Sequence, residues 1–235
     1  MKTPCSPSHS VRRTAAFTLI ELLTTVGVIA ALAALLLPAV NSARSKADAM
    51  QCLSNLRQLH VAYMQEVGDN DGALPWSYDF GKGTSWTEIY AESLGGNWQL
   101  ADGGAKLASA TGCPAQRRKL KLGGNRRTFA INISLTSDNS PIVEPGIPPK
   151  LGLFGNPSKT LLFADGPIKS ATSTQNVCNS TDKFPDCLHN GRANAAFLDG
   201  HAEPLTQQQW NAMKGALPTQ LNAVGTPLSI FWLGV

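Results

Sequence analysis

The sequence predicts an α+β protein in which one long N-terminal helix packs on a small antiparallel β-sheet. Residues 17–40 form an apolar run, and residues 48–67 then place apolar side chains at helical spacing. Short apolar or alternating segments bounded by Asp-Gly and Asn-Gly turns follow in the second half. One helix followed by a series of strands is typical of the α+β class.

The first apolar run is long enough to cross a membrane. Residues 22–40 are nineteen uncharged residues, which cover about 28 Å as a helix, close to the hydrocarbon thickness of a bilayer. A secretory signal peptide is the alternative, but its apolar core is usually only about 7–15 residues long. We therefore expect a retained single span over about residues 17–40. Its one acid is Glu21, and a lone carboxylate at membrane depth usually has a function.

The excess of positive charge lies in the first sixteen residues, which hold Lys2, Arg12 and Arg13 and no acid. The net charge is +4, and 17 of the 20 basic side chains remain against 16 acidic ones once these three are set aside. The charge therefore does not indicate a nucleic-acid partner. A basic leader is retained in the cytoplasm, so we expect the chain after residue 40 to lie outside it, in the periplasm or at the cell surface.

The second half of the helix is predicted to be amphipathic. Its apolar stripe contains Ala49, Cys52 or Leu53, Leu56, Leu59 or His60, Tyr63 and Val67. Pro38 lacks an amide hydrogen and should loosen or kink the helix. Gly68 and the polar residues after it supply the stop. These signals divide the chain into a leader (1–16), a long helix (17–68) and an exported head (69–235).

Strands are predicted over residues 127–133, 160–164, 193–198 and 201–205, with the apolar tail 228–233 as a last strand. Asp199-Gly200 is the expected hairpin turn, and Asn190-Gly191 is a turn at the other end of the same strand. Residues 73–128 should be loops with a short helix near 86–94. Their tryptophans, Trp76, Trp86 and Trp98, are expected in the core or in a lid, with a sugar-binding platform as the alternative.

His189 and Asp199 are separated by a predicted strand and cannot build one site, because its ends would be over about 20 Å apart. His189 should instead face Asp165 at the end of the preceding strand; an Arg192–Asp165 pair is the alternative. Calcium is a further alternative near Asp165, Asp199 or the loop holding Asp69 and Asp71, since oxygen-rich loops suit that ion.

Four cysteines lie on the expected exported side, where disulfides persist, and they allow three pairings. We predict Cys52–Cys113, which would attach the helix to the head, and Cys178–Cys187, which would close a short loop. Free buried thiols are the alternative. No paired CxxC motif or His/Cys cluster supports zinc, and calcium is the only cofactor left open.

Sequence signatures of catalysis are missing: the chain has no GxSxG elbow, phosphate-binding loop or HExxH motif. Residues 116–127 hold six basic side chains. A solvated basic loop explains them better than DNA binding, because no aromatic stacking platform is interleaved. We expect no enzyme activity, no catalytic residue and no nucleic-acid partner.

Residues 16–23, AFTLIELL, resemble the class III leader of type IV prepilins and type II secretion pseudopilins. The resemblance implies that a membrane prepilin peptidase cuts between Ala16 and Phe17 and methylates the new amino group. The usual residue before the cut is Gly, so Ala16 departs from the pattern. The implied fold is pilin-like.

A second resemblance lies at residues 189–200, where His189, nine residues and then Asp199-Gly200 look like the processing-associated motif of a large pseudopilin-like group. Three further segments look like landmarks of that group: residues 52–59, Cys113-Pro114 and residues 163–165. The resemblance spans most of the chain after the leader, and residues 73–110 and 205–235 match least.

The two resemblances imply a structural subunit of a type II secretion pseudopilus or type IV pilus-like filament. Its partners would be the prepilin peptidase, other pilin-like subunits and the membrane. Glu21 would pair with the free amine of Phe17 in a neighbouring copy and so set the register of parallel helices. The alternative is a Glu21 side chain that snorkels to the membrane edge or is protonated there. The rivals are a monomeric membrane-anchored protein that binds a ligand such as a glycan, and a secreted enzyme with an uncleaved anchor.

Overall fold

The computed structural model describes residues 18–79, 84–86, 90, 93–94, 112–119, 128–136, 143, 147–170, 173–174, 177–215 and 225–234. The chain divides into two compact units, Met1–Ala43 and Arg44–Val235. One helix, α1 (Leu19–Asp69), begins in the first unit and ends in the second.

In the first unit, residues 18–43 are all exposed, including every large apolar side chain of this half of α1. Pro38 lies inside the helix without ending it. By length and composition alone, α1 is able to cross a membrane. The structure thus has the long apolar N-terminal helix that the sequence predicts.

The second unit is built on a five-stranded sheet with the order β7-β3-β4-β8-β9. The strands are β3 (Phe129–Asn132), β4 (Leu161–Asp165), β7 (Val177–Cys178), β8 (Arg192–Phe197) and β9 (Ala202–Thr206). The predicted antiparallel pairing holds for β3–β4, β4–β8 and β8–β9, whereas β7 pairs parallel with β3. The fold is therefore α+β with a mixed sheet, consistent with a pilin-like fold.

Smaller elements complete the second unit. They are the hairpins β1 (Tyr78–Asp79) with β2 (Thr84–Ser85) and β5 (Ile168–Ser170) with β6 (Ser173–Thr174), the helices α3 (Pro114–Lys119), α4 (Gln207–Ala212) and α5 (Pro227–Leu233), and the 3₁₀ turns Ile133–Leu135, Leu151–Leu153 and Pro157–Lys159.

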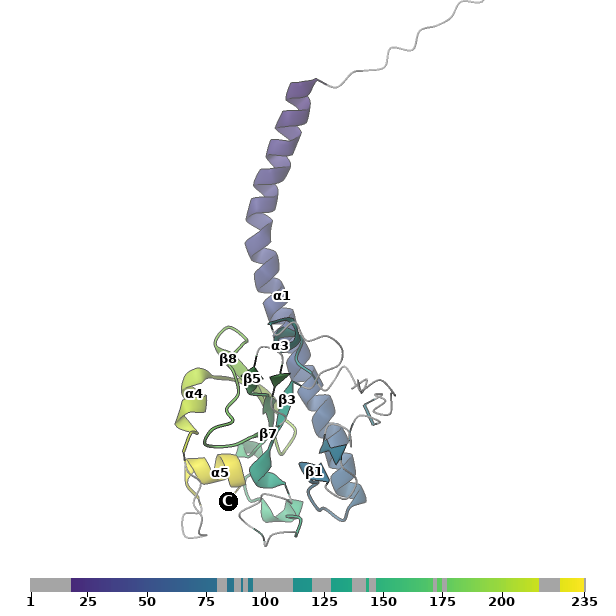
Figure 1. Ribbon diagram of the computed structural model, residues 1–235, viewed down its shortest axis with the longest axis vertical. Coiled ribbons are helices and arrows are strands. Elements are labelled where there is room, and N and C mark those ends of the chain that lie inside the picture. Colours follow the sequence, from purple (N-terminus) through teal and green to yellow (C-terminus); the bar gives the residue numbers. More distant parts are fainter. Residues whose placement is uncertain are drawn as a thin grey trace, which may run out of the picture. The chain divides into compact units, whose positions relative to one another are not determined.

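The sheet is covered on both faces, with the C-terminal half of α1 on one side and α4 and α5 on the other (Figure 1). The α1 face buries a stripe that repeats every three to four residues: Cys52, Asn55, Leu56, Leu59, Ala62, Tyr63 and Val67. The predicted amphipathic stripe is thereby confirmed. The other core contains Trp210, Phe231 and Trp232. A bulge between Leu161 and Phe163 in β4 directs Leu162 and Phe163 to the α1 side together.

The C-terminal tail is a helix, so the predicted last strand is wrong. The side chain of Thr226 accepts from Ser229 N–H, Pro227 occupies the first turn, and Gly234 ends α5 in a left-handed conformation (φ 73°). These are the start and stop signals of a short helix. These capping signals outweigh the strand propensity of Ile230, Phe231 and Trp232. Burial of the tail is compatible with a helix as well as with a strand.

The two turns that flank β8 are confirmed. Asn190 and Gly191 both have positive φ (51° and 78°), and Gly200 has φ 94°. Only the Gly200 turn is crowded: a Cβ there would lie 2.8 Å from Cε1 of His60, whose Nε2 lies 3.0 Å from Leu198 O. Around Gly191 no atom lies within 4 Å of that position. His60 thereby docks α1 onto the β8–β9 turn.

Replacing these two glycines by alanine separates backbone strain from the contact with α1. Gly191→Ala should lower the free energy of unfolding by about 1 kcal/mol through the left-handed backbone alone. Gly200→Ala should cost about 2–4 kcal/mol, because the His60 ring must also move. Urea denaturation measures both values. In a His60→Ala background the excess should disappear, and equal costs in the native background would contradict the docking contact.

Candidate functional site

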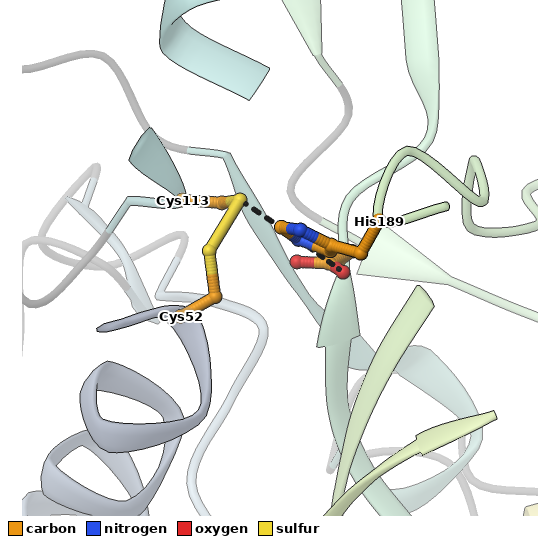
Figure 2. Close-up of side chains that lie close together, drawn as sticks. Cys52, Cys113 and His189 are labelled. Carbon is orange, nitrogen blue, oxygen red and sulfur yellow. Dashed lines mark hydrogen bonds and ion pairs between the residues drawn. A yellow bond between two sulfur atoms is a disulfide. The ribbon is translucent and has the colours of Figure 1, made fainter. Parts of the chain in front are cut away.

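A buried group of chemically reactive side chains lies where α1 meets the sheet. Cys52, Cys113, Asp165 and His189 each place one potential ligand atom within 4.8 Å of the other three, and all four residues are buried. Figure 2 shows the imidazole of His189 directed at the sulfur of Cys113, with Cys52 beyond it on α1. We call these four residues the buried cluster.

The first pair in the buried cluster is the predicted Cys52–Cys113 disulfide, which the structure contains. It joins α1 to the segment before α3, and the two cysteines are 61 positions apart in the sequence. Asn55 supports it one turn further along α1, because its Nδ2 donates to Gly112 O at 3.0 Å. Cys113 N–H donates to Thr128 Oγ1 at the start of β3. Cys113 is thus held by α1 through the disulfide and the Asn55 contact to Gly112, and by the start of β3 through Thr128.

Helix α3 is fixed by its polar side chains. Gln116 is fully buried and its Nε2 donates to Gly166 O at 2.8 Å. Arg118 makes a bidentate ion pair with Asp48 of α1, at 2.6 and 2.9 Å, which raises the pKa of Arg118 above its ordinary value. Burial lowers the pKa of Arg117, whose guanidinium lies over Gly112. The prediction of a solvated basic loop is therefore wrong for Arg117 and Arg118, which lie on a helix and contact other parts of the chain. Residues 120–127 lie outside the described part.

His189 is presented by the tight turn before β8. Its N–H donates to Arg192 O at 2.9 Å, and Arg192 N–H donates back to His189 O at 3.1 Å. Asn190 and Gly191 supply the two positive φ values that this turn type requires. The turn directs the imidazole inward, and His189 is only 5% exposed.

The predicted pairing of His189 with Asp165 is confirmed: Nε2 and Oδ2 lie 3.4 Å apart. Asp165 ends β4 and is fully buried. Its Oδ2 accepts Asn194 N–H at 2.7 Å, whereas its Oδ1 has no hydrogen-bond partner among the described residues. Arg192, the alternative partner, is exposed.

The geometry excludes one familiar chemistry. In a catalytic Cys–His–Asp relay, the sulfur and the carboxylate meet opposite nitrogens of the imidazole. Here Cys113 Sγ lies 3.2 Å and Asp165 Oδ2 3.4 Å from the same atom, His189 Nε2. One nitrogen has either one proton or one lone pair, so Nε2 cannot take a proton from the sulfur and pass it to the carboxylate. The sulfur of Cys113 and the carboxylate of Asp165 instead both approach Nε2.

The second predicted disulfide is wrong, because Cys178 and Cys187 are free thiols. Parallel pairing with β3 fixes Cys178, and its side chain packs in the core under α4 and α5. Cys187 lies in the segment before His189 and is only partly buried. Burial raises the pKa of both thiols, and the nearby Asp165 and Asp186 charges raise that of Cys187 further.

The carboxylates proposed for calcium have separate environments. Asp165 is inside the buried cluster. Asp199 is in the β8–β9 turn, where its Oδ1 lies 2.6 Å from His201 Nδ1. Burial would raise the pKa of Asp199, but the hydrogen bonds from His201 lower it overall. Asp69 and Asp71 are exposed at the C-terminal end of α1.

Trp86 belongs to the core. It is fully buried, and its ring centroid lies 5.3 Å from that of Phe163. It therefore has no free face for stacking on a sugar. Trp76 is half-buried, and Trp98 lies outside the described residues.

At the N-terminal end, Ala16 and Phe17 lie outside the described residues, whereas Glu21 is described. Thr18 and Glu21 form a capping box: Thr18 N–H donates to Glu21 Oε2 at 2.9 Å, and Glu21 N–H donates to Thr18 Oγ1 at 3.3 Å. Thr24 and Thr25 donate to carbonyls of the preceding turn. Each of the four polar side chains of residues 18–40 therefore makes at least one hydrogen bond within this helix or its cap.

Sequence analysis missed the buried cluster as a whole, although it singled out all four residues. The available signal was that three separate landmark segments, Cys52, Cys113 and Asp165, precede the His189 motif. The four residues come together only because β3, β4 and β8 are neighbours in the sheet. A single sequence does not specify that strand order.

Comparisons with protein families, curated proteins and solved structures found no match to this chain.

Thiol labelling tests the cysteine assignment. In the native oxidised chain, an alkylating reagent should modify Cys187 slowly and Cys178 only after unfolding, because Cys178 is fully buried. Tryptic cleavage after Lys183 separates the two cysteines for mass spectrometry. Protection of both thiols until a reductant is added would instead indicate a Cys178–Cys187 bond.

Reduction of the Cys52–Cys113 bond should destabilise the protein. A cross-link across 61 residues corresponds to about 4 kcal/mol in the chain-entropy account, and measured losses are usually about 2–5 kcal/mol. Urea denaturation of the full chain in detergent, with a chelator and with or without a phosphine reductant, measures the difference. A Cys178→Ser, Cys187→Ser variant is the matched control, and its own stability should respond to the reductant in the same way.

Proposed function

We propose that this protein is a structural, pilin-like subunit that is trimmed before Phe17 by a prepilin peptidase and assembles through α1. The product would be a type II secretion pseudopilus or a type IV pilus-like filament. The observation that carries the proposal is the contrast within α1. Residues 18–43 are all exposed and contain one charged group, Glu21, while one face of the continuing helix is buried in the head.

Exposure of so much apolar surface requires a lipid or protein environment. A bilayer satisfies the apolar side chains but not an ionised Glu21, which needs a cation or a proton there. Residues 18–43 contain no Lys or Arg. Cleavage before Phe17 would create an amine at the depth of Glu21. In a parallel assembly, the amine of one copy can neutralise the carboxylate of its neighbour and fix their register.

The capping box adds a condition to this mechanism. In the isolated chain Oε2 of Glu21 accepts both hydrogen bonds from Thr18, at 2.9 Å from the amide and 2.7 Å from the hydroxyl. A carboxylate has a second oxygen with further acceptor capacity. Glu21 can therefore cap its own helix and receive the neighbour's amine at the same time.

Small residues on α1 also support assembly. Helices in lipid associate mainly through close packing of small side chains and through polar pairs. Gly27 weakens an isolated helix by roughly 1 kcal/mol relative to Ala. No described atom outside its local helix lies within 4 Å of its Cβ position. Its presence is explained if a second helix approaches there, beside Ala30, Ala31, Ala33 and Ala34.

A membrane-anchored monomer that binds a glycan is less well supported, because Trp86, Trp210 and Trp232 are fully buried. The two functions differ in a measurable way, since a monomeric binder needs no neighbour for Glu21.

Substitutions at Glu21 separate its charge from its capping role. Glu21→Gln keeps an N3 side chain that can complete the capping box but removes the charge, whereas Glu21→Ala removes both. Crosslinking of the full chain in membranes that contain the assembly machinery should give an oligomer ladder for the native protein. We expect both variants to lose at least about nine-tenths of the ladder, since a lost charge pair leaves the amine unpaired in lipid.

Glu203→Gln makes the same chemical change at an exposed site on β9 and is the control. It should leave the ladder intact. A native-like ladder from Glu21→Gln would mean that capping, not charge, is the role of Glu21. Mass spectrometry of the native N-terminus provides an independent check: N-methylated Phe17 is expected, and a start at Met1 would contradict processing.

A further inference from the structure

From the geometry of the buried cluster we infer a second state for its sulfurs: when Cys52 and Cys113 are reduced, they hold a zinc ion together with His189 and Asp165. The inference is independent of the assembly role of α1. It concerns a set of ligands contributed by four segments that are far apart in the sequence.

The distances fit a tetrahedral ion. With Zn–S near 2.3 Å and Zn–N and Zn–O near 2.0–2.2 Å, neighbouring ligand atoms should lie roughly 3.3–3.8 Å apart. Nε2 of His189 lies 3.2 Å from Cys113 Sγ and 3.4 Å from Asp165 Oδ2. All four ligand atoms lie within 4.8 Å of one another. Small side-chain movements would therefore complete the coordination.

The contacts of the imidazole also suit a cation. A sulfur and a carboxylate both approach Nε2, which can satisfy only one of them by a linear hydrogen bond. An ion between the three atoms would be a partner for all of them at once. Asp165 Oδ1, fully buried and without a hydrogen-bond partner among the described residues, offers a further lone pair at the same place.

The chemistry of the donors selects the metal. Thiolates are soft ligands, so a set with two of them disfavours calcium and magnesium, which take oxygen ligands. Two sulfurs with one imidazole and one carboxylate suit zinc. Asn194 N–H holds the Asp165 carboxylate at 2.7 Å, which is the kind of outer contact that orients a metal ligand. The Arg117 guanidinium lies against Gly112, the residue before Cys113, and places a positive charge next to this segment.

The metal and the disulfide are alternative states of the same two sulfurs. Oxidation of the zinc-bound pair by an external disulfide transfers two electrons from the thiolates to that disulfide. One Cys52–Cys113 bond forms, the external S–S bond breaks, two protons are taken up by the released thiols, and one Zn²⁺ leaves. The reverse reaction requires a thiol reductant and zinc. The oxidised chain should therefore bind no zinc at this place.

The test uses the full chain in detergent with Cys5, Cys178 and Cys187 replaced by Ser. After reduction without oxygen, added Zn²⁺ should be retained at one ion per chain on gel filtration. Zinc X-ray absorption should give two sulfur scatterers near 2.3 Å and two nitrogen or oxygen scatterers near 2.0–2.2 Å. The same chain before reduction should retain none. Absence of zinc from the reduced chain, or a shell without sulfur or without nitrogen and oxygen, would overturn the proposal.

Variants then identify the other two ligands. His189→Ala and Asp165→Asn should each weaken Co²⁺ binding at least about 100-fold, since loss even of an outer-shell partner costs about 10–100-fold. The thiolate-to-cobalt charge-transfer band measures binding. His201→Ala and Asp199→Asn, the exposed His–Asp pair in the β8–β9 turn, are the matched controls and should bind as the parent does. If both the His189→Ala and the Asp165→Asn variants bound Co²⁺ as tightly as the parent, only the two cysteines would be ligands, and the proposal would be overturned.

Discussion

The structure depends on one division within α1: its C-terminal half is buried by its own chain, and its N-terminal half is not. Leu56, Leu59 and Tyr63 pack against the sheet and fix the head, whereas residues 18–43 have no buried side chain. The exposed half therefore requires lipid or other helices, and its one carboxylate limits which environment is stable. An anchored monomer meets the second requirement only if Glu21 takes up a proton. In the proposed assembly, the Phe17 amine of a neighbouring copy would supply a positive charge for an ionised Glu21.

The head is held to α1 by polar as well as apolar contacts, and these meet at the buried cluster. The Cys52–Cys113 bond, the Asn55–Gly112 hydrogen bond and the Asp48–Arg118 ion pair all join α1 to one short segment around α3. His189 and Asp165 complete the cluster from the sheet side. Two of these four residues, Cys52 and Cys113, form the bond that attaches the helix, and in the proposed zinc state that bond would be open. In a filament, a change there would alter how firmly each subunit holds the helix through which it contacts its neighbours.

Local patterns in the sequence were sufficient for much of this fold. The amphipathic stripe, the Asp199-Gly200 and Asn190-Gly191 turns and strands β4, β8 and β9 follow from short-range periodicity and turn chemistry. The His189–Asp165 pair also followed, because an antiparallel neighbour brings the end of one strand beside the start of the next. Predictions failed where tertiary pairing or capping decides. Cys178 lies on β7, which pairs parallel with β3, and it forms no disulfide with Cys187. The apolar tail is a helix because Thr226 caps it and Pro227 occupies its first turn. The buried cluster needed the strand order, and the capping role of Glu21 was overlooked although Thr18 precedes it by three residues.

The most direct measurement of the central claim is a zero-length crosslink between the two charges. A hydrophobic carbodiimide applied to native membranes should join the Glu21 carboxylate of one chain to the Phe17 amine of another as an amide. Mixing isotopically light and heavy chains before assembly distinguishes bonds between copies from bonds within one. If the charges pair between copies, mass spectrometry should detect mixed light–heavy Phe17–Glu21 peptides. Recovery of Glu21 peptides without such a bond, from chains that still carry their first sixteen residues, would contradict this pairing.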